Sequence, residues 1–421
     1  MSALMETPLR ESEQAAAVRQ TSCAIVGGGP AGMMLGLILA RAGVPTVLLE
    51  AHQDFDRDFR GDTVHPSTLE CLDQLGLSER IHALPHGKLR TMELHTPSGV
   101  VTMADLSRLR TRFPYILVLP QARLLEVLAE EARRHPNFQL ILGAKVQRLI
   151  EDDGRVCGVV YCDEHGEWRE VRAELTVAAD GRFSKIRNLA GLTQMQTAPP
   201  MDVVWFRLPR KESDPAGHAE IHVGGGRFVI LLDRTTDWQI GYVIFKGAFG
   251  ALKAAGIGEL RSGLAQAVPW LADRVAELQD WKKIAVLNVE SGRLKTWHRP
   301  GLLFIGDAAH TMSPVGGVGI NVAIQDAVET ANLLAGKLRG GHVSDADLAG
   351  VQQRREFAVK VVQRIQGVLQ DRIAAPSLRS DQPFRLPWLV RLISMIPVLR
   401  DIPARILAFG PRRVRIARQL L

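Results

Sequence analysis

The residues best suited to chemistry near the start of the chain are three glycines and an acid. Gly27, Gly29 and Gly32 form a G-x-G-x-x-G pattern, and Glu50 follows eighteen residues after the last glycine. In such a pattern the first glycine permits a tight turn, the second lets backbone N–H groups approach a pyrophosphate, and the third lets a helix pack closely on a strand. A carboxylate at position 50 is suited to an unphosphorylated ribose. The pattern predicts a nucleotide site and does not separate NAD from FAD.

A second glycine-rich stretch lies far down the chain. Gly306 and Asp307 follow an apolar strand at 301–305, and a loop from Pro314 to Asn321 opens another helix. The N-terminus of a helix carries partial positive charge and free N–H groups. We therefore expect this second helix end to face another part of one long cofactor, with Asp307 accepting hydrogen bonds from hydroxyls of a sugar-like chain.

Alternating strands and helices are expected to position these groups. The glycine turn follows an apolar strand at 23–26 and opens a helix that runs to about residue 42, and a strand at 45–49 ends at Glu50. Asp180-Gly181 ends a later strand, and by spacing alone it is a turn with Ser184 as a helix cap. Arg60 lies just before a helix that starts at Pro66 or Ser67, where its guanidinium either grips a phosphate or stays at the surface.

The stretch 201–249 alternates apolar and polar residues in four runs separated by turns, which predicts a meander of antiparallel strands. Trp205 and Arg207 share one face of the first strand. His222 and Tyr242 either line a pocket or serve as ordinary sheet residues. No His, Tyr or Asp carries a motif that would mark it as a general base, so the catalytic residues remain unassigned, and His310 is expected to be a packing residue.

Composition limits the class of protein. The chain has 421 residues, of which 46% are hydrophobic and 23% charged, as in an ordinary globular protein. Its four cysteines show no C-x-x-C pair, so we expect thiols of a reducing compartment and no metal site. The net charge of +7 arises from Arg385 onward, where there are eight arginines and one acid. This local charge, without a nucleic-acid motif, argues against a nucleic-acid partner.

The two ends are expected to differ from the body. Residues 1–20 contain no apolar run and are expected to be a loose tail, and no later segment has the length of a membrane span, so a cytoplasmic protein is expected. A long helix is expected from 345 to about 373, with Phe357, Val361, Ile365 and Val368 on one stripe. Beyond residue 383 a basic amphipathic segment either packs on its own chain or contacts a membrane surface.

Together these motifs resemble those of the class A flavoprotein monooxygenases, the para-hydroxybenzoate hydroxylase family. The resemblance spans residues 22–338 and implies an α/β fold: a Rossmann-like, doubly wound FAD-binding domain, an interleaved antiparallel β-sheet substrate domain and a C-terminal helical segment. The expected division is a tail at 1–20, an FAD-binding domain at 21–90, 109–195 and 284–343, a substrate domain at 91–108 and 196–283, and a helical segment at 344–421.

The resemblance also implies roles for single residues. Asp180 resembles the family's Asp-Gly residue that helps to hold FAD and serves nicotinamide-cofactor binding, and the N–H groups of the 319–321 loop are expected to face the flavin's pyrimidine edge. The residues expected to bind the cofactor are Gly27, Gly29, Pro30, Ala31, Gly32, Glu50, Arg60, Gln121, Val146, Asp180, Gly306, Asp307, Gly317, Gly319, Ile320 and Asn321. Those expected near the substrate are Trp205, Arg207, His222, Tyr242 and Pro314.

The implied chemistry is reduction of FAD by NADPH or NADH, reaction with dioxygen to a flavin C4a-hydroperoxide, and hydroxylation of an aromatic, lipophilic or otherwise electron-rich small molecule by a monomer or homodimer. An FAD-dependent reductase of the geranylgeranyl type, acting on a lipophilic substrate, is the main alternative. A flavin-dependent halogenase is disfavoured because the tryptophans never form a W-x-W-x-I-P segment. A non-catalytic FAD-binding module is a third interpretation, which the intact Asp180 and Asp307 motifs disfavour.

Overall fold

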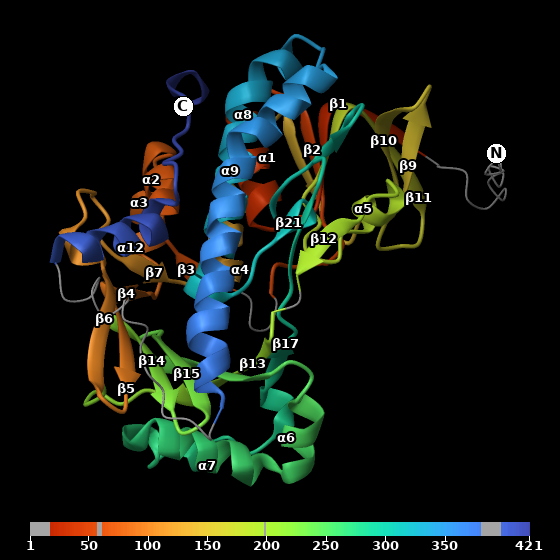
Figure 1. Ribbon diagram of the computed structural model, residues 1–421. Helices are drawn as coiled ribbons and strands as arrows, with labels where there is room; N and C mark the ends of the chain where they lie inside the picture. The colour runs from red at the N-terminus through yellow and green to blue at the C-terminus, as the bar shows by residue number, and fades with distance from the viewer. Residues whose placement is uncertain (1–16, 57–60, 198, 380–396) are drawn as a thin grey trace.

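A mixed eight-stranded sheet forms one half of the molecule. The structure is a computed structural model that describes residues 17–56, 61–197, 199–379 and 397–421 (Figure 1). The strand order is β19-β20-β11-β1-β2-β8, and the β9–β10 hairpin pairs with β11. Strands β20, β11, β1, β2 and β8 run parallel. The bounds are β1 Ala17–Val26, β2 Thr46–Leu49, β8 Phe138–Ile141, β9 Lys145–Asp152, β10 Arg155–Cys162, β11 Trp168–Ala178, β19 His298–Arg299 and β20 Leu302–Phe304.

Both faces of this sheet are buried, which explains why its strands are almost continuously apolar. Cys23 and Ile25 of β1 pack in a core that also holds helices α1, α4 and α8. Ala24 and Val26 point the other way, into a second core that α9 helps to cover. The helices on these faces are α1 Pro30–Arg41, α2 Pro66–Gln74, α3 Ser78–His82, α4 Gln121–Ala132, α5 Lys185–Leu189 and α8 Gly319–Arg339. The expected doubly wound fold is confirmed.

The predicted N-terminal tail is too long. Strand β1 begins at Ala17, and residues 17–21 pair in parallel with residues 169–173 of β11. The cross-strand ladder satisfies their backbone hydrogen bonds, although the segment has no apolar run to signal it. Residues 1–16 lie outside the described part of the chain.

A seven-stranded sheet, in the order β17-β13-β16-β15-β14-β5-β6, forms the second half. Strands β13 to β16 are antiparallel as predicted, but the predicted meander holds only for β14, β15 and β16, because β13 pairs with β16 and not with β14. Strands β14 and β5 pair in parallel. Helices α6 Phe249–Ala255 and α7 Ile257–Ala267 cover one face (Figure 1). The strand bounds are β5 Thr91–Thr96, β6 Gly99–Asp105, β13 Met201–Pro209, β14 His218–Gly224, β15 Arg227–Asp233, β16 Asp237–Phe245 and β17 Ala285–Leu287.

Smaller pieces join the two halves. A three-stranded sheet is formed by β3 Thr63–Val64, β7 Ile116–Val118 and β4 Gly87–Leu89. Another is formed by β12 Gln194–Thr197, β18 Ser291–Leu294 and β21 His310–Thr311. Figure 1 shows α9, Asp345–Leu369, running from beside α8 to the second sheet. It continues as a π-helix over Gln370–Ala374 and a short α10, Ala375–Ser377.

The stripe predicted for α9 is wrong. Phe357 is 61% exposed and Val368 is 53% exposed. The buried face instead includes Val351, Arg355 and Val359. A buried acid on α8 accounts for this difference, because it draws a charged residue of α9 inward.

The end of the chain returns to the body of the molecule. Helix α12, Pro397–Phe409, packs beside α2 and β6. Arg413 forms an ion pair with Glu70, and Gln74 donates a hydrogen bond to the carbonyl of Ile416 at 3.1 Å. The described part of the basic segment therefore packs on its own chain, whereas residues 380–396 lie outside the described residues. None of the described helices is both long and apolar enough to span a bilayer.

Candidate active site

The three sequence motifs meet at one edge of the parallel sheet. Val26 of β1 pairs with Ala178 of β11, which pairs with Phe304 of β20. Each strand therefore ends level with its neighbour, and the turns that begin at Gly27, Ala179 and Ile305 leave the sheet side by side. Ligands of open α/β sheets bind outside the carboxyl ends of such strands.

The glycine turn fits a pyrophosphate. A side chain at Gly27, whose φ is +106°, would place its Cβ 2.4 Å from the carbonyl oxygen of Ala179, and one at Gly32 would lie 1.9 Å from the carbonyl oxygen of Gly27. A Cβ at Gly29 would meet no atom of the described chain within 4 Å. Helix α1 has Pro30 at its first position, no acid in its first turn and no capping side chain among the described residues. The helix therefore offers free N–H groups, including that of Ala31, beside an open approach at Gly29.

Glu50 lies where a ribose acceptor is predicted. Its Oε2 accepts a hydrogen bond from the N–H of Gly28 at 2.7 Å, and its Oε1 lies 2.6 Å from Nδ1 of His52. The carboxylate is buried, and a surface groove of about 390 Å³ begins at the next residue, Ala51. The groove leaves room for the nucleoside end of a ligand. Val146, also expected to touch the cofactor, is buried in the core between β9 and the parallel sheet.

Asp180 organises its own turn. Its carboxylate accepts hydrogen bonds from Oγ of Ser184 at 2.6 Å and from the N–H of Ile186 at 3.0 Å. Burial raises the pKa of Asp180 above its usual value, and these hydrogen bonds oppose that rise. Arg187 in the same turn donates to the carbonyl of Ala308 at 3.1 Å. The Asp-Gly turn is thus attached directly to the Gly306-Asp307 loop.

The Gly306-Asp307 turn also contacts the first glycine turn. A Cβ at Gly306, whose φ is +59°, would lie 3.2 Å from the Cβ of Ala31. Asp307 follows in a single 3₁₀ turn with its side chain partly exposed. A half-buried carboxylate on this edge is suited to accept hydrogen bonds from hydroxyls of a ligand that also reaches Gly29.

The loop before α8 is held by its own side chains. Asn321 accepts hydrogen bonds from the N–H of His65 and from Oγ1 of Thr68, both at 2.8 Å. Thr63 donates to the carbonyl of Gly317 at 2.8 Å. The Asn321 side chain therefore ties α2 to α8, while the N–H groups at Gly319 and Ile320 lie in an uncapped first turn, as judged from the described residues. These N–H groups can stabilise negative charge.

The predicted substrate residues divide between the two faces of the second sheet. Trp205 shares a cross-strand row with Gly241, and His222 shares the adjacent row with Tyr242. Successive residues of a strand point to opposite faces, so these rows face opposite ways. Trp205 packs in one apolar cluster with Val315 of the loop before α8. That face, which also carries Arg207, is the one turned toward the loop from Pro314 to Asn321, which we call the cofactor loop.

His222 and Tyr242 are not brought to that face. A Cβ at Gly263 of α7 would lie 2.6 Å from the hydroxyl of Tyr242. The ring of His222 stacks on that of His95 at 4.3 Å, and its Nε2 lies 2.6 Å from Oε2 of Glu220. The two imidazole planes are only 18° apart. Because nitrogen lone pairs lie in the plane of each ring, this stacking does not suit a shared metal ion, even though the ligand atoms of His95, Glu220 and His222 lie within 4.8 Å of one another.

Three further predicted residues are Pro314, Gln121 and Arg60. Pro314 lies between Ser313 and Val315, whose carbonyls each accept a hydrogen bond from Gln366 of α9 at 2.8 Å. Gln121 is the first residue of α4. Arg60 lies outside the described residues.

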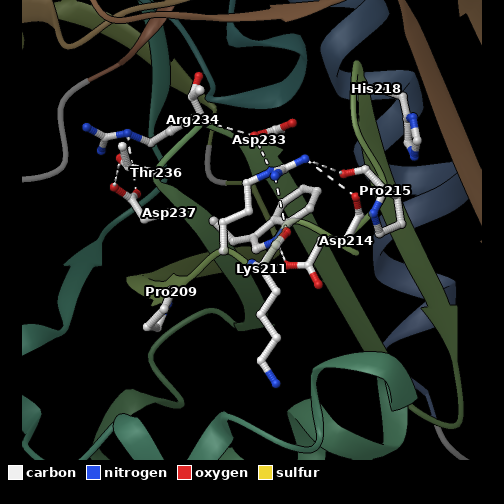
Figure 2. A network of polar contacts seen from close by, with 12 residues as sticks. Pro209, Lys211, Asp214, Pro215, His218, Asp233, Arg234, Thr236 and Asp237 are labelled. Atoms are coloured by element: carbon white, nitrogen blue, oxygen red, sulfur yellow. Dashed lines mark hydrogen bonds and ion pairs between the residues drawn. The ribbon is translucent and has the colours of Figure 1, made fainter.

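Sequence reasoning missed Asp62. This side chain is 6% exposed, and its Oδ2 lies 3.2 Å from Nη1 of Arg234 in the β15–β16 turn. Figure 2 shows Arg234 beside Asp237 of the same turn. Burial raises the pKa of Asp62 to about 6, although Arg234 and Arg207 act to lower it. The neighbouring Gly61 lies against Ile320 of the cofactor loop. Asp62 thus stands where the cofactor loop meets the second sheet, and only a long-range contact reveals it.

A buried ionic cluster behind the loop was also missed. Asp326 of α8 accepts hydrogen bonds from the N–H of Gly306 at 3.0 Å and from Nε of Arg355 at 2.7 Å, and it lies 2.5 Å from Nε2 of His310. Burial acts to raise the pKa of Asp326, but the interactions with His310 and Arg355 outweigh it and hold this pKa below its usual value. His310, expected to be a packing residue, is a member of this cluster.

These observations define a class of protein. A Rossmann-type sheet with three cradle turns at its carboxyl edge, joined to a second sheet whose apolar face meets the third turn, is an FAD-binding architecture. A family model described as an FAD binding domain matches residues 20–365. The chain belongs to this family.

The particular relatives are monooxygenases. The 6-methylpretetramide 4-monooxygenase of Streptomyces rimosus is 35% identical over 404 residues, which cover 95% of each chain. The anhydrotetracycline hydroxylase of the same organism is 25% identical with a TM-score of 0.72, covering 92% of this chain and 76% of that one. A probable FAD-dependent monooxygenase from Pseudomonas aeruginosa, 19% identical, shares the fold with a TM-score of 0.74 over 86% of this chain and 98% of its own.

The chain is an FAD-dependent monooxygenase of the class A flavoprotein type. The resemblance found in the sequence is confirmed, and the relatives support monooxygenation rather than the reductase alternative.

Proposed function

We propose that this enzyme uses NADH or NADPH and dioxygen to hydroxylate a phenolic, fused-ring aromatic small molecule. The observation that carries the proposal is the full-length similarity to a 6-methylpretetramide 4-monooxygenase. The apolar sheet face with Trp205 and Val315 supports it, because a flat aromatic ligand gains most from burial against such a surface. The assignment of residues 91–108 and 196–283 to the substrate domain is part of this proposal, as are a cytoplasmic location and a monomeric or homodimeric state.

The chain's own residues would hold FAD along the sheet edge. The glycine turn would hold the pyrophosphate, Glu50 the ribose, Asp307 the ribityl hydroxyls, and the N–H groups at 319–321 the pyrimidine edge. FAD, when bound, supplies electron transfer from the nicotinamide and activation of dioxygen. The apolar cluster around Trp205 would keep water away from that end of the bound cofactor.

Asp62 is the residue we propose as proton acceptor. A phenol becomes more reactive toward an electrophilic oxygen when its hydroxyl proton is removed. A carboxylate with a pKa of about 6 is mostly ionised at neutral pH yet basic enough to accept that proton. Arg234 beside it orients the carboxylate and stabilises its charge.

The test is a panel of phenolic, polycyclic and isoprenoid compounds added to the FAD-loaded enzyme with NADH or NADPH. We expect a hydroxylated aromatic compound to accelerate nicotinamide oxidation by at least about tenfold, with one atom from ¹⁸O₂ appearing in the product. Saturation of an isoprenoid double bond without oxygen uptake would overturn the proposal in favour of a reductase. Oxygen uptake that yields only hydrogen peroxide with every phenol would overturn the substrate class.

A further inference from the structure

A small cavity lies behind the cofactor loop. It has a volume of about 20 Å³ and is bounded by Ser67 of α2, Asn321 and Val322 of α8, Arg355 of α9, and Leu407 near the end of the chain. Most of the residues that line it are apolar. A space of this size holds one or two small species.

Arg355 faces this cavity with unsatisfied donors. The side chain is 0% exposed, and only its Nε is used, in the hydrogen bond to Asp326. Its Nη1 and Nη2 are buried without a hydrogen-bond partner among the described residues, and so is Oγ of Ser67. Buried polar groups in proteins nearly always have a partner, so each of these atoms requires one.

Two helix ends add positive charge at the same place. Ser67 lies in the first turn of α2, which begins at Pro66, and Val322 lies in the first turn of α8, which begins at Gly319. Asp326 balances the formal charge of Arg355 from the Nε side. His65, which precedes α2, stays neutral because burial lowers its pKa to about 4. The helix dipoles therefore leave a local excess of positive potential.

We propose that this cavity binds a single monovalent anion of halide size, held by Nη1 and Nη2 of Arg355 and Oγ of Ser67. A water molecule is the competing occupant, and it could donate to the Ser67 hydroxyl or to the amide oxygen of Gln325, but its two lone pairs cannot accept from all three unsatisfied donor groups. The guanidinium nitrogens can only donate. An anion accepts from every unsatisfied donor at once.

Binding there would join α2, α9 and the segment around Leu407 directly behind the cofactor loop. We therefore expect the anion to stabilise the folded enzyme and to slow the release of FAD, whatever the substrate proves to be. The inference does not depend on the proposed hydroxylation.

The test compares the full-length FAD-loaded enzyme in sodium bromide or chloride with the same enzyme in sodium gluconate at equal ionic strength. We expect a saturable rise in melting temperature in halide and an anomalous bromide peak within hydrogen-bond distance of Arg355 in crystals. Ser67→Ala should raise the half-saturating halide concentration about tenfold. Ser262→Ala, at an exposed serine of α7, should leave it unchanged.

A second variant, Val362→Met, fills the cavity and should abolish the halide response without removing any charge. Equal melting temperatures in bromide and gluconate would overturn the proposal. So would a bromide-soaked crystal in which the cavity is empty or holds only water.

Discussion

Gly27 and Gly29 are two residues apart, but an added methyl group meets different surroundings at each. At Gly27 it overlaps the Ala179 carbonyl, and at Gly29 it meets no described atom within 4 Å. We expect Gly29→Ala to leave the stability of the FAD-free protein unchanged and to weaken FAD binding at least about 30-fold, or roughly 2 kcal/mol, because the methyl occupies the pyrophosphate approach. Gly27→Ala should cost about 3 kcal/mol or more of folding free energy. Fluorescence titration measures the FAD affinity of each variant, and urea unfolding measures its stability. Normal FAD binding by Gly29→Ala would refute the assignment of Gly29 to the pyrophosphate approach.

Asp62 predicts a pH dependence whose sign follows from its raised pKa. An acid whose pKa rises from 3.8 to about 6 on folding binds its proton more tightly in the folded state. The stabilisation of the folded state by protonated Asp62 is therefore fully present below pH 3.8, and it is lost as the pH rises through about 6. Asn cannot ionise, so Asp62→Asn should be more stable than wild type at pH 7.5 by up to about 3 kcal/mol, and similar at pH 4. Urea unfolding of both proteins at pH 7.5 and at pH 4 measures these differences in stability.

The same substitution should lower hydroxylation. Wild-type product formation is expected to rise with a midpoint near pH 6, because the ionised Asp62 accepts the proton. Asp62→Asn should form product slowly at every pH while still binding FAD, and Asp62→Glu should restore part of the rate. An unchanged pH profile in Asp62→Asn would exclude Asp62 as the proton acceptor.

At the scale of elements, α8 and α9 are joined by the buried Asp326–Arg355 pair. Asp326→Asn leaves the Arg355 charge buried without its counter-ion, which should cost about 3–5 kcal/mol of folding free energy. The Gly306 N–H also loses a charged acceptor, so FAD should dissociate faster. Glu356→Gln, at the next residue of α9, is the matched control. It removes the charge of Glu356 and the partly exposed ion pair with Lys360, and it should lower the folding free energy by less than about 0.5 kcal/mol. Urea unfolding measures both variants. Similar losses of folding free energy would mean that the buried Asp326–Arg355 pair contributes no more to stability than the exposed pair.

The sequence predicts elements whose burial follows a simple period. The runs in 201–245 alternate apolar and polar residues, and the structure has them as β13 to β16. Strand β1 at its C-terminal end is apolar on both faces, and the structure buries both. The glycine-rich motifs predict the turns at Gly27 and Gly306, and in the structure both residues have the positive φ that favours glycine.

What the sequence could not predict depends on contacts between distant segments. The buried face of α9 follows from Arg355 pairing with Asp326, a contact that no periodicity of α9 signals. Asp62 acquires its environment from Arg234, far along the chain. His222 and Tyr242 alternate correctly along their strands, but which face of the sheet meets the cofactor loop depends on how the two halves dock.

At the scale of the whole molecule, the cofactor cradle exists only when the chain is folded. Its three turns, at 27–32, 180–187 and 306–321, come from the start, middle and end of the FAD-binding half, and they meet because β1, β11 and β20 end level. Gln366 of α9 donates hydrogen bonds to the third turn, and Ile373, in the π-helix that continues α9, packs with Trp205 of the second sheet. One ligand that spans all three turns should therefore stabilise them together.

We expect the binding of FAD to the FAD-free enzyme to change amide hydrogen-exchange rates in all three turns. At a hundredfold excess over the dissociation constant, a ligand that binds only the folded state stabilises it by about 2.7 kcal/mol. Exchange should slow in residues 27–32, 180–187 and 306–321 at once, because each segment would contact a different part of the same molecule. Helix α7, which covers the far face of the second sheet, should exchange at an unchanged rate and serves as the internal control. Protection confined to residues 27–32 would mean that the later turns do not hold the same ligand, and the assignment of Asp307 and of the 319–321 N–H groups to the flavin end would then be wrong.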